Sequence, residues 1–379
     1  MSIPAQRLDY MNVARGFAIL MVIFVHTAQA IPGLSFYTSV VSQYGQFGVQ
    51  LFFVASAYTL SLSSEARSND SKPLLFFYIR RFFRIAPLYY VASFVYFLFF
   101  TLKKFYLEGT VSSFEPYTFF NVMANLLLIH GFVPSANNNI VPGGWSIGTE
   151  MAFYLIFPFL FAFLKSGMVG SLKKVVAVIM FAFFVNIIFQ LLASRYTSIG
   201  LDKSDFFYFN IVNQIPTFLL GILTYFFCRN GKEKEARVSS VYLVALWLAF
   251  SALALYVLNL DNFLMRAIVP TISGISFSFL VLFLRKINSS NYLLSKIGIR
   301  SFSMYIFHFI FAWGAIPVIS KKLNKVMNPD LTLVLSFLIV VALTYFVATI
   351  TEKHIEKTGI SLGKRLIDSY NRRNGMREA

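Results

Sequence analysis

The sequence predicts an all-α polytopic membrane protein with about ten transmembrane helices and one short re-entrant or interfacial helix. Composition carries this prediction: of 379 residues, 57% are hydrophobic and 13% are charged, and Phe alone accounts for 45. A soluble domain has about 25% charged residues. The mean hydropathy is +0.67. Because a soluble fold cannot bury so much apolar surface behind so few charges, soluble, disordered, collagen-like and disulfide-stapled proteins are excluded.

The apolar runs give the number of spans, since a spanning helix needs about 20 apolar residues. Ten runs are suitable: residues 13–31, 46–63, 86–102, 146–164, 175–193, 209–228, 239–258, 267–284, 301–319 and 331–351. An eleventh run, residues 119–133, is short and contains Asn121, Asn125 and His130. No repeat or appended soluble domain is found. We therefore expect one membrane domain over residues 1–379.

The positions of Lys and Arg decide whether residues 119–133 cross the membrane, because cytoplasmic loops are enriched in them. With a cytoplasmic N-terminus and no crossing, 24 of the 33 lie inside and 8 outside, with Arg15 within the first span. With a crossing, 12 lie inside and 20 outside. We therefore expect both termini in the cytoplasm, a basic cytoplasmic tail over 352–379, and 119–133 on the outer side. The net charge of +17 falls in short clusters between spans, which suits anionic lipid rather than nucleic acid.

The first span contains two ionisable residues, which are costly in a membrane and are therefore candidates for function. Arg15 and His26 have ten residues between them. Eleven steps of 100° place both on one helix face, about 16 Å apart. A cation near the cytoplasm and a deeper imidazole suit an extended donor with an anionic head, and His is a common general base. Alternatively, Arg15 reaches lipid headgroups and His26 is a polar residue between helices.

Further candidates lie in other spans and in the loop before the third span. Glu150, one turn into a span at a depth comparable with His26, could orient an imidazole, or could merely favour the helix start. The segment FFYIRRFFRIAP, expected to be a loop before Pro87 opens the span, supplies Arg80, Arg81 and Arg84. Arginines suit phosphates, although such clusters also act only as topology signals.

The remaining histidines give weaker signals. His308 lies near Ser303 and Tyr305, and alone is expected to be a packed core residue. His130 could line an acceptor cavity, and His354 falls in the tail. The sequence contains no metal-ligand constellation, no phosphate-binding glycine loop and no nucleophile elbow, so no metal is expected.

Several segments in order resemble the integral-membrane acyltransferase family 3. LDYMNVARGFAILMVIFVH is similar to the family's first span, with Arg, ten residues and then His. The other matching segments are FFVASAYTL at 52–60; Arg80, Arg81, Arg84, Ile85 and Pro87; Trp145, Ser146 and Glu150; FLLG at 218–221; Ser-x-x-x-Tyr-x-x-His at 301–308; and HIEKTG at 354–359. The resemblance covers residues 9 to about 359.

This resemblance implies transfer of an acyl group, usually acetyl, from cytoplasmic acetyl-CoA or another acyl-CoA to a hydroxyl of a cell-surface carbohydrate or its lipid-linked precursor, in the bacterial inner membrane. On this resemblance Arg15 and His26 are essential and Glu150 belongs to the site. We expect His26, Glu150 and Arg15 to act in catalysis, Arg15, Arg80, Arg81 and Arg84 to bind the donor, and Trp145, Asn125 and His308 to contact the acceptor. Any second transfer step would need a partner protein of glycan assembly. A non-enzymatic carrier or exporter of a lipid-linked sugar or small organic anion would use the same buried charges and stays open. The oligomeric state is not readable.

Overall fold

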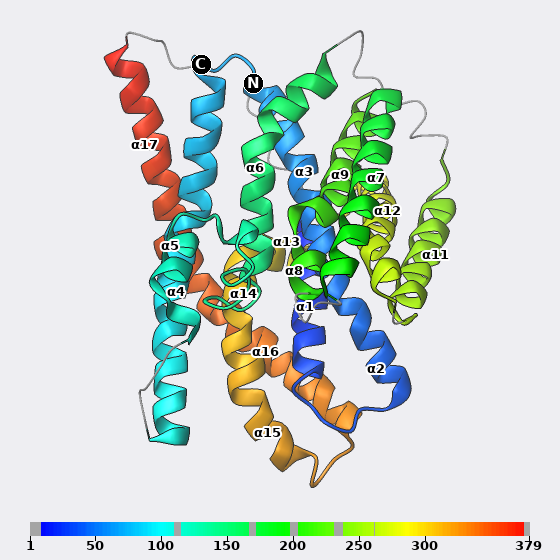
Figure 1. Ribbon diagram of the computed structural model, residues 1–379, viewed down its shortest axis with the longest axis vertical. Coiled ribbons are helices and arrows are strands. Elements are labelled where there is room, and N and C mark those ends of the chain that lie inside the picture. The colour runs from blue at the N-terminus through cyan, green and yellow to red at the C-terminus, as the bar shows by residue number, and fades with distance from the viewer. Residues whose placement is uncertain are drawn as a thin grey trace.

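A computed structural model describes residues 9–109, 115–166, 172–197, 204–230, 238–260 and 262–374. Every regular element within these ranges is a helix, and most helices run along the long axis of the molecule (Figure 1). This confirms the all-α fold class. Residues 1–8 and 375–379, which the sequence assigns to the cytoplasm, lie outside the described residues.

Ten helical segments are long and apolar enough to cross a membrane, which confirms the ten expected spans. They are Asp9–Ala28, Phe36–Ala66, Pro73–Tyr106, Gly144–Lys165, Leu172–Arg195, Asp205–Arg229, Ser240–Leu258, Ala267–Lys286, Ser301–Leu323 and Pro329–Arg373. Residues 119–133 form only a short helix, α5 (Phe119–Leu126), and a 3-10 turn, η4 (His130–Phe132).

Some spans are single helices and others are assembled from shorter pieces. The single helices are α1 (Asp9–Ala28), α4 (Pro73–Glu108), α6 (Gly144–Lys165), α7 (Leu172–Thr197), α11 (Ser240–Leu258) and α12 (Phe263–Lys286). The composite spans join α2 (Phe36–Gln43), η2 (Tyr44–Phe47) and α3 (Gly48–Ala66); α8 (Ser204–Phe209) and α9 (Ile211–Asn230); α14 (Ser301–Phe309), the π turn η5 (Ile310–Ala315) and α15 (Ile316–Leu323); and α16 (Pro329–Thr351), the π turn η6 (Glu352–Glu356) and α17 (Lys357–Arg373). Two short connections are η3 (Glu115–Tyr117) and α13 (Tyr292–Ile299).

The segment with Arg80, Arg81 and Arg84 is helical, which corrects the expected loop. α4 begins at Pro73, a residue suited to a first helical turn, and continues through the arginines into the span. Arginine is a good helix former, so charge alone does not interrupt the helix. Pro87 lies inside α4 instead of opening it. The three guanidinium groups are therefore carried on a rigid element.

A glycine on α17 explains how α4 tolerates Pro87. Proline has no N–H to bond the carbonyl of Phe83, one turn earlier. A Cβ on Gly359 would lie 2.6 Å from that carbonyl oxygen and 2.8 Å from Pro87 Cγ, so only glycine lets α17 approach. α17 lies beside α4 (Figure 1). The tail after residue 352, expected only to be basic and cytoplasmic, thus includes a helix packed against a span.

The position of α1 is fixed by a second glycine contact. α1 packs against α3, α12, α13, α14 and α16. Where it crosses α13, a Cβ on Gly16 would lie 2.1 Å from Leu294 O, and a Cβ on Gly298 would lie 1.8 Å from Asn12 O. The two backbones therefore touch, which anchors the turn of α1 next to Arg15.

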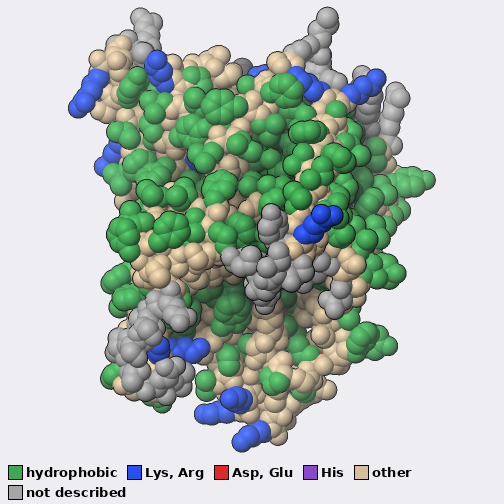
Figure 2. Space-filling view, viewed as in Figure 1, with side chains coloured by type: hydrophobic (Ala, Val, Ile, Leu, Met, Phe, Trp, Pro, Cys, Tyr) green, Lys and Arg blue, Asp and Glu red, His purple; other side chains and the backbone are tan. Residues whose placement is uncertain are grey.

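The outer surface of the bundle is apolar, as a lipid-facing surface requires. Figure 2 shows hydrophobic side chains over most of one face, with Lys and Arg mostly toward its ends. Phe94, Phe181 and Phe346 are each more than 60% exposed on α4, α7 and α16. Exposed apolar surface of this extent marks membrane contact. We call the end of the bundle where α17 and α6 terminate the α17 end, and the opposite end, with α2 and α15, the α2 end (Figure 1).

Candidate active site

Five helices enclose a cavity of about 80 Å³ that contains three arginines, which we call the arginine cavity. Arg15 comes from α1, and Arg81 and Arg84 come from α4. The other polar lining residues are Ser56 and Thr59 of α3, Ser146, Glu150 and Tyr154 of α6, and Ser301 and Tyr305 of α14. Four of the residues singled out from the sequence, Arg15, Arg81, Arg84 and Glu150, thus meet in one cavity.

Glu150 supplies the single carboxylate among the lining residues of this cavity. Its Oε1 accepts hydrogen bonds from Ser56 Oγ and Tyr154 OH, both at 2.5 Å. Because Glu150 follows the first turn of α6, which begins at Gly144, the helix dipole does not account for its place. Tyr154 stands four residues after Glu150, so its contribution could have been read from the helical spacing.

The guanidinium groups are only partly satisfied by the protein. Arg15 Nη2 donates to Thr59 Oγ1 at 2.9 Å. Arg81 Cζ lies 5.9 Å from the ring centroids of Phe77 and Tyr154, and its buried Nε has no hydrogen-bond partner among the residues that the structure describes. Within the described residues, no hydrogen bond or ion pair to Arg84 is found. Three cations therefore face one carboxylate, and this excess charge favours an anionic ligand.

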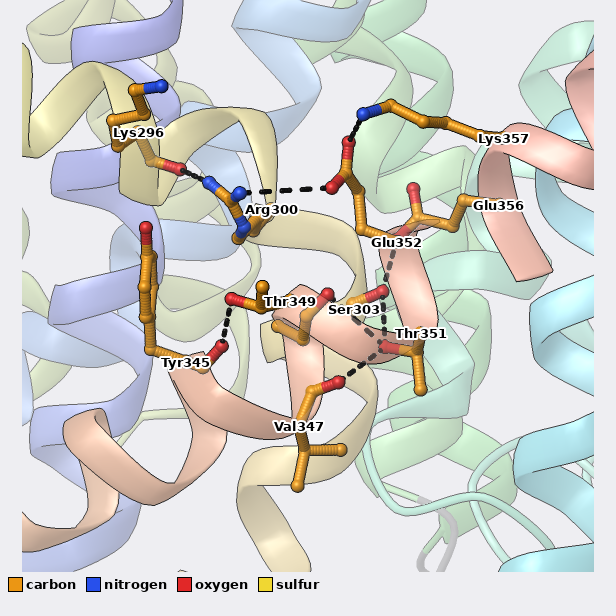
Figure 3. A network of polar contacts seen from close by, with 11 residues as sticks. Lys296, Arg300, Ser303, Tyr345, Val347, Thr349, Thr351, Glu352, Glu356 and Lys357 are labelled. Atoms are coloured by element: carbon orange, nitrogen blue, oxygen red, sulfur yellow. Dashed lines mark hydrogen bonds and ion pairs between the residues drawn. The ribbon is translucent and has the colours of Figure 1, made fainter. Parts of the chain in front are cut away.

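A polar network between α14 and η6 adds a second carboxylate that interacts with Arg84. Glu356 and Glu352 lie on the π turn η6 and are 8% and 6% exposed. Ser303 of α14 donates to Glu356, and Glu352 pairs with Lys357 at 2.8 Å and with Arg300 at 3.9 Å (Figure 3). Glu356 also interacts electrostatically with Arg84. Even with Glu356 counted, positive charge remains in excess. In the sequence, Glu356 stands out only as part of HIEKTG.

Arg80 lies apart from the arginine cavity. It forms an ion pair with Asp70 at 2.5 Å. Arg80 lines a neighbouring pocket of about 380 Å³ with Arg67, Lys165 and Arg81, at the ends of α3 and α6 and thus at the α17 end. Because Arg81 lines both spaces, the two basic sites adjoin.

His26 lies toward the other end of α1, among aromatic rings. Its ring centroid is 4.5 Å from that of Phe309, 5.3 Å from that of His308 and 5.6 Å from that of Trp313. Its Nδ1 lies 2.9 Å from Gln29 Oε1. Because an amide oxygen only accepts, Nδ1 carries the proton and Nε2 keeps its lone pair. Gln29 therefore fixes the tautomer that a general base requires; its spacing of three residues from His26 was the available sequence signal.

Glu150 makes no hydrogen bond with His26 in the described structure. Tyr305 lies next to both, since it shares the cavity with Glu150 and contacts His308, the neighbour of His26. Tyr305 lines the arginine cavity, and its ring centroid is 5.8 Å from that of His308. Its hydroxyl donates to Gly143 O at 2.9 Å. His308 is fully buried, with Nδ1 2.6 Å from Tyr305 O and, within the described residues, no hydrogen-bond partner for Nε2. The structure thus places His308 beside His26, and Glu150 beside Arg15.

Asn125 and Trp145 belong to the packing around the start of α6. Asn125 Oδ1 accepts from Tyr89 OH at 2.6 Å, and Trp145 stacks on Phe209 with centroids 4.2 Å apart. His130 lies 3.0 Å from Gly144 O through its Nε2, and burial lowers its pKa to about 4. These contacts fix the backbone at which α6 begins. Neither Asn125 nor Trp145 lines the arginine cavity.

Comparison with known proteins identifies the family of this chain. The chain is 36% identical over 131 residues to the peptidoglycan O-acetyltransferase OatA of Listeria monocytogenes serovar 1/2a, a match that covers 32% of this chain and 20% of that protein. No solved structure matches the chain significantly. The family model for the acyltransferase domain matches residues 8–353. With ten spans and a match over nearly its whole length, this chain is a multi-pass membrane protein that belongs to acyltransferase family 3.

Proposed function

We propose that this acyltransferase moves an acyl group, acetyl in the simplest case, from cytoplasmic acyl-CoA to a hydroxyl of a cell-surface carbohydrate or its lipid-linked precursor. The observation that carries the proposal is the arginine cavity, in which three guanidinium groups face one carboxylate. The similarity to an O-acetyltransferase of peptidoglycan supports a carbohydrate acceptor. The count of Lys and Arg supports a cytoplasmic α17 end.

The donor would enter at the α17 end. Its nucleotide head would contact the pocket with Arg67, Arg80 and Lys165, and its diphosphate would contact the guanidinium groups of the arginine cavity, so that its arm continues toward His26. Arginine forks suit phosphate oxygens because they donate two parallel hydrogen bonds. The pantetheine arm is about as long as the separation of about 16 Å between Arg15 and His26. Tyr305 stands on this route and would have to yield to the thioester.

His26 would act as the base. The acceptor oxygen attacks the thioester carbon and its proton passes to His26 Nε2, which has no hydrogen-bond partner in the described residues. The carbon–sulfur bond then breaks, and the departing thiolate takes that proton from His26 Nε2, leaving CoA, an ester and the neutral imidazole. Gln29 keeps Nδ1 protonated throughout. Glu150 would balance the charge of Arg15 rather than orient the imidazole, since it lines the arginine cavity with Arg15 and makes no hydrogen bond with His26 within the described residues.

The test is thiol release by purified protein supplied with acetyl-CoA and a carbohydrate acceptor. An acyltransferase of this kind frees CoA in proportion to ester formed, whereas a carrier frees none. His26→Ala should abolish ester formation but keep membrane insertion. Full activity in His26→Ala would show that His26 is not the base. Absence of thiol release from the wild type with every acceptor would exclude acyl-CoA as the donor.

A further inference from the structure

A polar groove at the α2 end has no part in the donor route. It lies where α1 ends and the chain returns through α2 and η2, and its volume is about 440 Å³. Small-molecule sites have volumes of about 300–1,000 Å³. Its polar lining residues are Gln29, Ser39, Ser42, Gln43 and Gln46, and the others are aliphatic or glycine. None of the lining residues carries a charge, in contrast to both basic sites at the donor side.

The groove is built from fixed elements. α2 is capped by Ser35, whose N–H donates to Asp330 of α16 at 3.0 Å. η2 is pressed against α1, because a Cβ on Gly45 would lie 2.3 Å from Met21 O. α2 and η2 therefore hold the shape of the groove before a ligand binds, which reduces the entropic cost of binding.

Its polar groups leave hydrogen-bonding capacity for a ligand. Ser42 Oγ donates to Ser39 O at 2.8 Å, and Gln46 Nε2 donates to Gln43 O at 2.9 Å. Ser42 Oγ and Gln46 Oε1 can each still accept, and the side-chain amide of Gln43 has no hydrogen bond within the described structure. Neutral donors and acceptors of this kind match sugar hydroxyls, whereas a carboxylate or phosphate would lose its hydration without meeting a cation.

Gln29 connects this groove to the imidazole. It lines the groove, and its Oε1 bonds His26 Nδ1 at 2.9 Å. The wall of the groove is therefore one hydrogen bond from the base. We propose that the groove is the acceptor subsite and takes a neutral, hydroxyl-rich segment of carbohydrate, whose reacting hydroxyl passes Gln29 to reach His26. This inference rests on the proposed function, because it needs His26 to be the base.

The test uses purified full-length protein in nanodiscs and two oligosaccharides of equal length: neutral tetra-N-acetylchitotetraose and anionic tetragalacturonate. Saturation-transfer NMR measures their binding, and thiol release measures KM for each substrate. In the double variant Gln43→Ala/Gln46→Ala, loss of two hydrogen bonds should raise the Kd and KM for the neutral sugar about tenfold or more. The KM for acetyl-CoA should stay unchanged. Ser39→Trp, which fills the groove, should act in the same direction, and Asn259→Ala at the end of α11 is the matched control.

The outcomes separate the two proposals. Equal binding of the neutral sugar by the wild type and both groove variants would overturn the assignment of the groove as the acceptor subsite. So would a lack of binding by the wild type. If tetragalacturonate binds more tightly than the neutral sugar, the inference that the groove takes a neutral carbohydrate is wrong. Binding that depends on the groove without any thiol release would support the subsite and reject acyl-CoA chemistry instead.

Discussion

Arg84→Ala should weaken use of the donor without weakening the fold. Arg84 makes no hydrogen bond or ion pair within the described residues, so its removal breaks none there. Loss of its attraction to Glu356 is offset by relief of its repulsion with Arg15. A hydrogen bond to a charged group contributes about 1.5–3 kcal/mol. Since about 1.4 kcal/mol is a factor of ten, the KM for acetyl-CoA should rise about 10- to 150-fold. Arg84→Lys keeps the charge but loses the fork and should show a smaller rise.

The assay is the initial rate of thiol release against acetyl-CoA concentration, with the thermal midpoint of each variant recorded alongside. Arg80→Ala is the comparison, because Asp70 already neutralises Arg80 and its loss should raise KM less. An Arg84→Ala protein with KM within twofold of the wild type, next to a large rise in Arg80→Ala, would refute the reasoning. It would mean that the ion-paired arginine, and not the unpaired one, binds the donor.

Three further predictions concern the base, the packing and the buried imidazole outside the spans. Gln29→Ala should lower kcat about 10- to 100-fold with KM for acetyl-CoA unchanged, because His26 loses the partner that sets its tautomer; an unchanged pH profile of kcat would contradict this role. Gly298→Ala should abolish the folded protein in detergent chromatography, because its Cβ would lie 1.8 Å from Asn12 O, and a normal monodisperse yield would contradict the close crossing. The free energy of unfolding should fall by up to about 3 kcal/mol as the pH drops from 6.5 to 4, since unfolded imidazole takes up a proton that buried His130, with its pKa near 4, does not. In His130→Gln the part of this fall that is due to His130 should be absent. If the thermal midpoints of both proteins fall equally with pH, the prediction is wrong.

The spans were predictable from the sequence because hydropathy and length alone select a membrane helix. The extension of α4 was not predictable. A window of apolar residues stops at Arg80, Arg81 and Arg84, although the helix continues through them. Pro87 also suggested that the helix begins there, because proline is common in a first helical turn. Only the packing of Gly359 on Phe83 shows why a proline can lie within this helix, and that contact joins residues far apart in the chain.

The candidate site was predictable in part. Helical geometry places Arg15 and His26 on one face, and inspection of intramembrane charges identifies Glu150. That Glu150 lies with Arg15 while His26 lies with His308 depends on how α1, α6 and α14 pack. No spacing within one helix contains that information. Gln29 and Tyr154 were within reach, because each is a neighbour of its partner on the same helix.

The most direct test of the account is transfer of radiolabelled acetyl from acetyl-CoA in nanodiscs that hold the wild type, Arg84→Ala or His26→Ala. The wild type should yield labelled sugar ester and release an equal amount of CoA. Arg84→Ala should recover the wild-type rate at high acetyl-CoA, and His26→Ala should give no ester at any concentration. If His26→Ala transfers acetyl as fast as the wild type, or if added donor fails to rescue Arg84→Ala, the assignment of base and donor cavity is wrong.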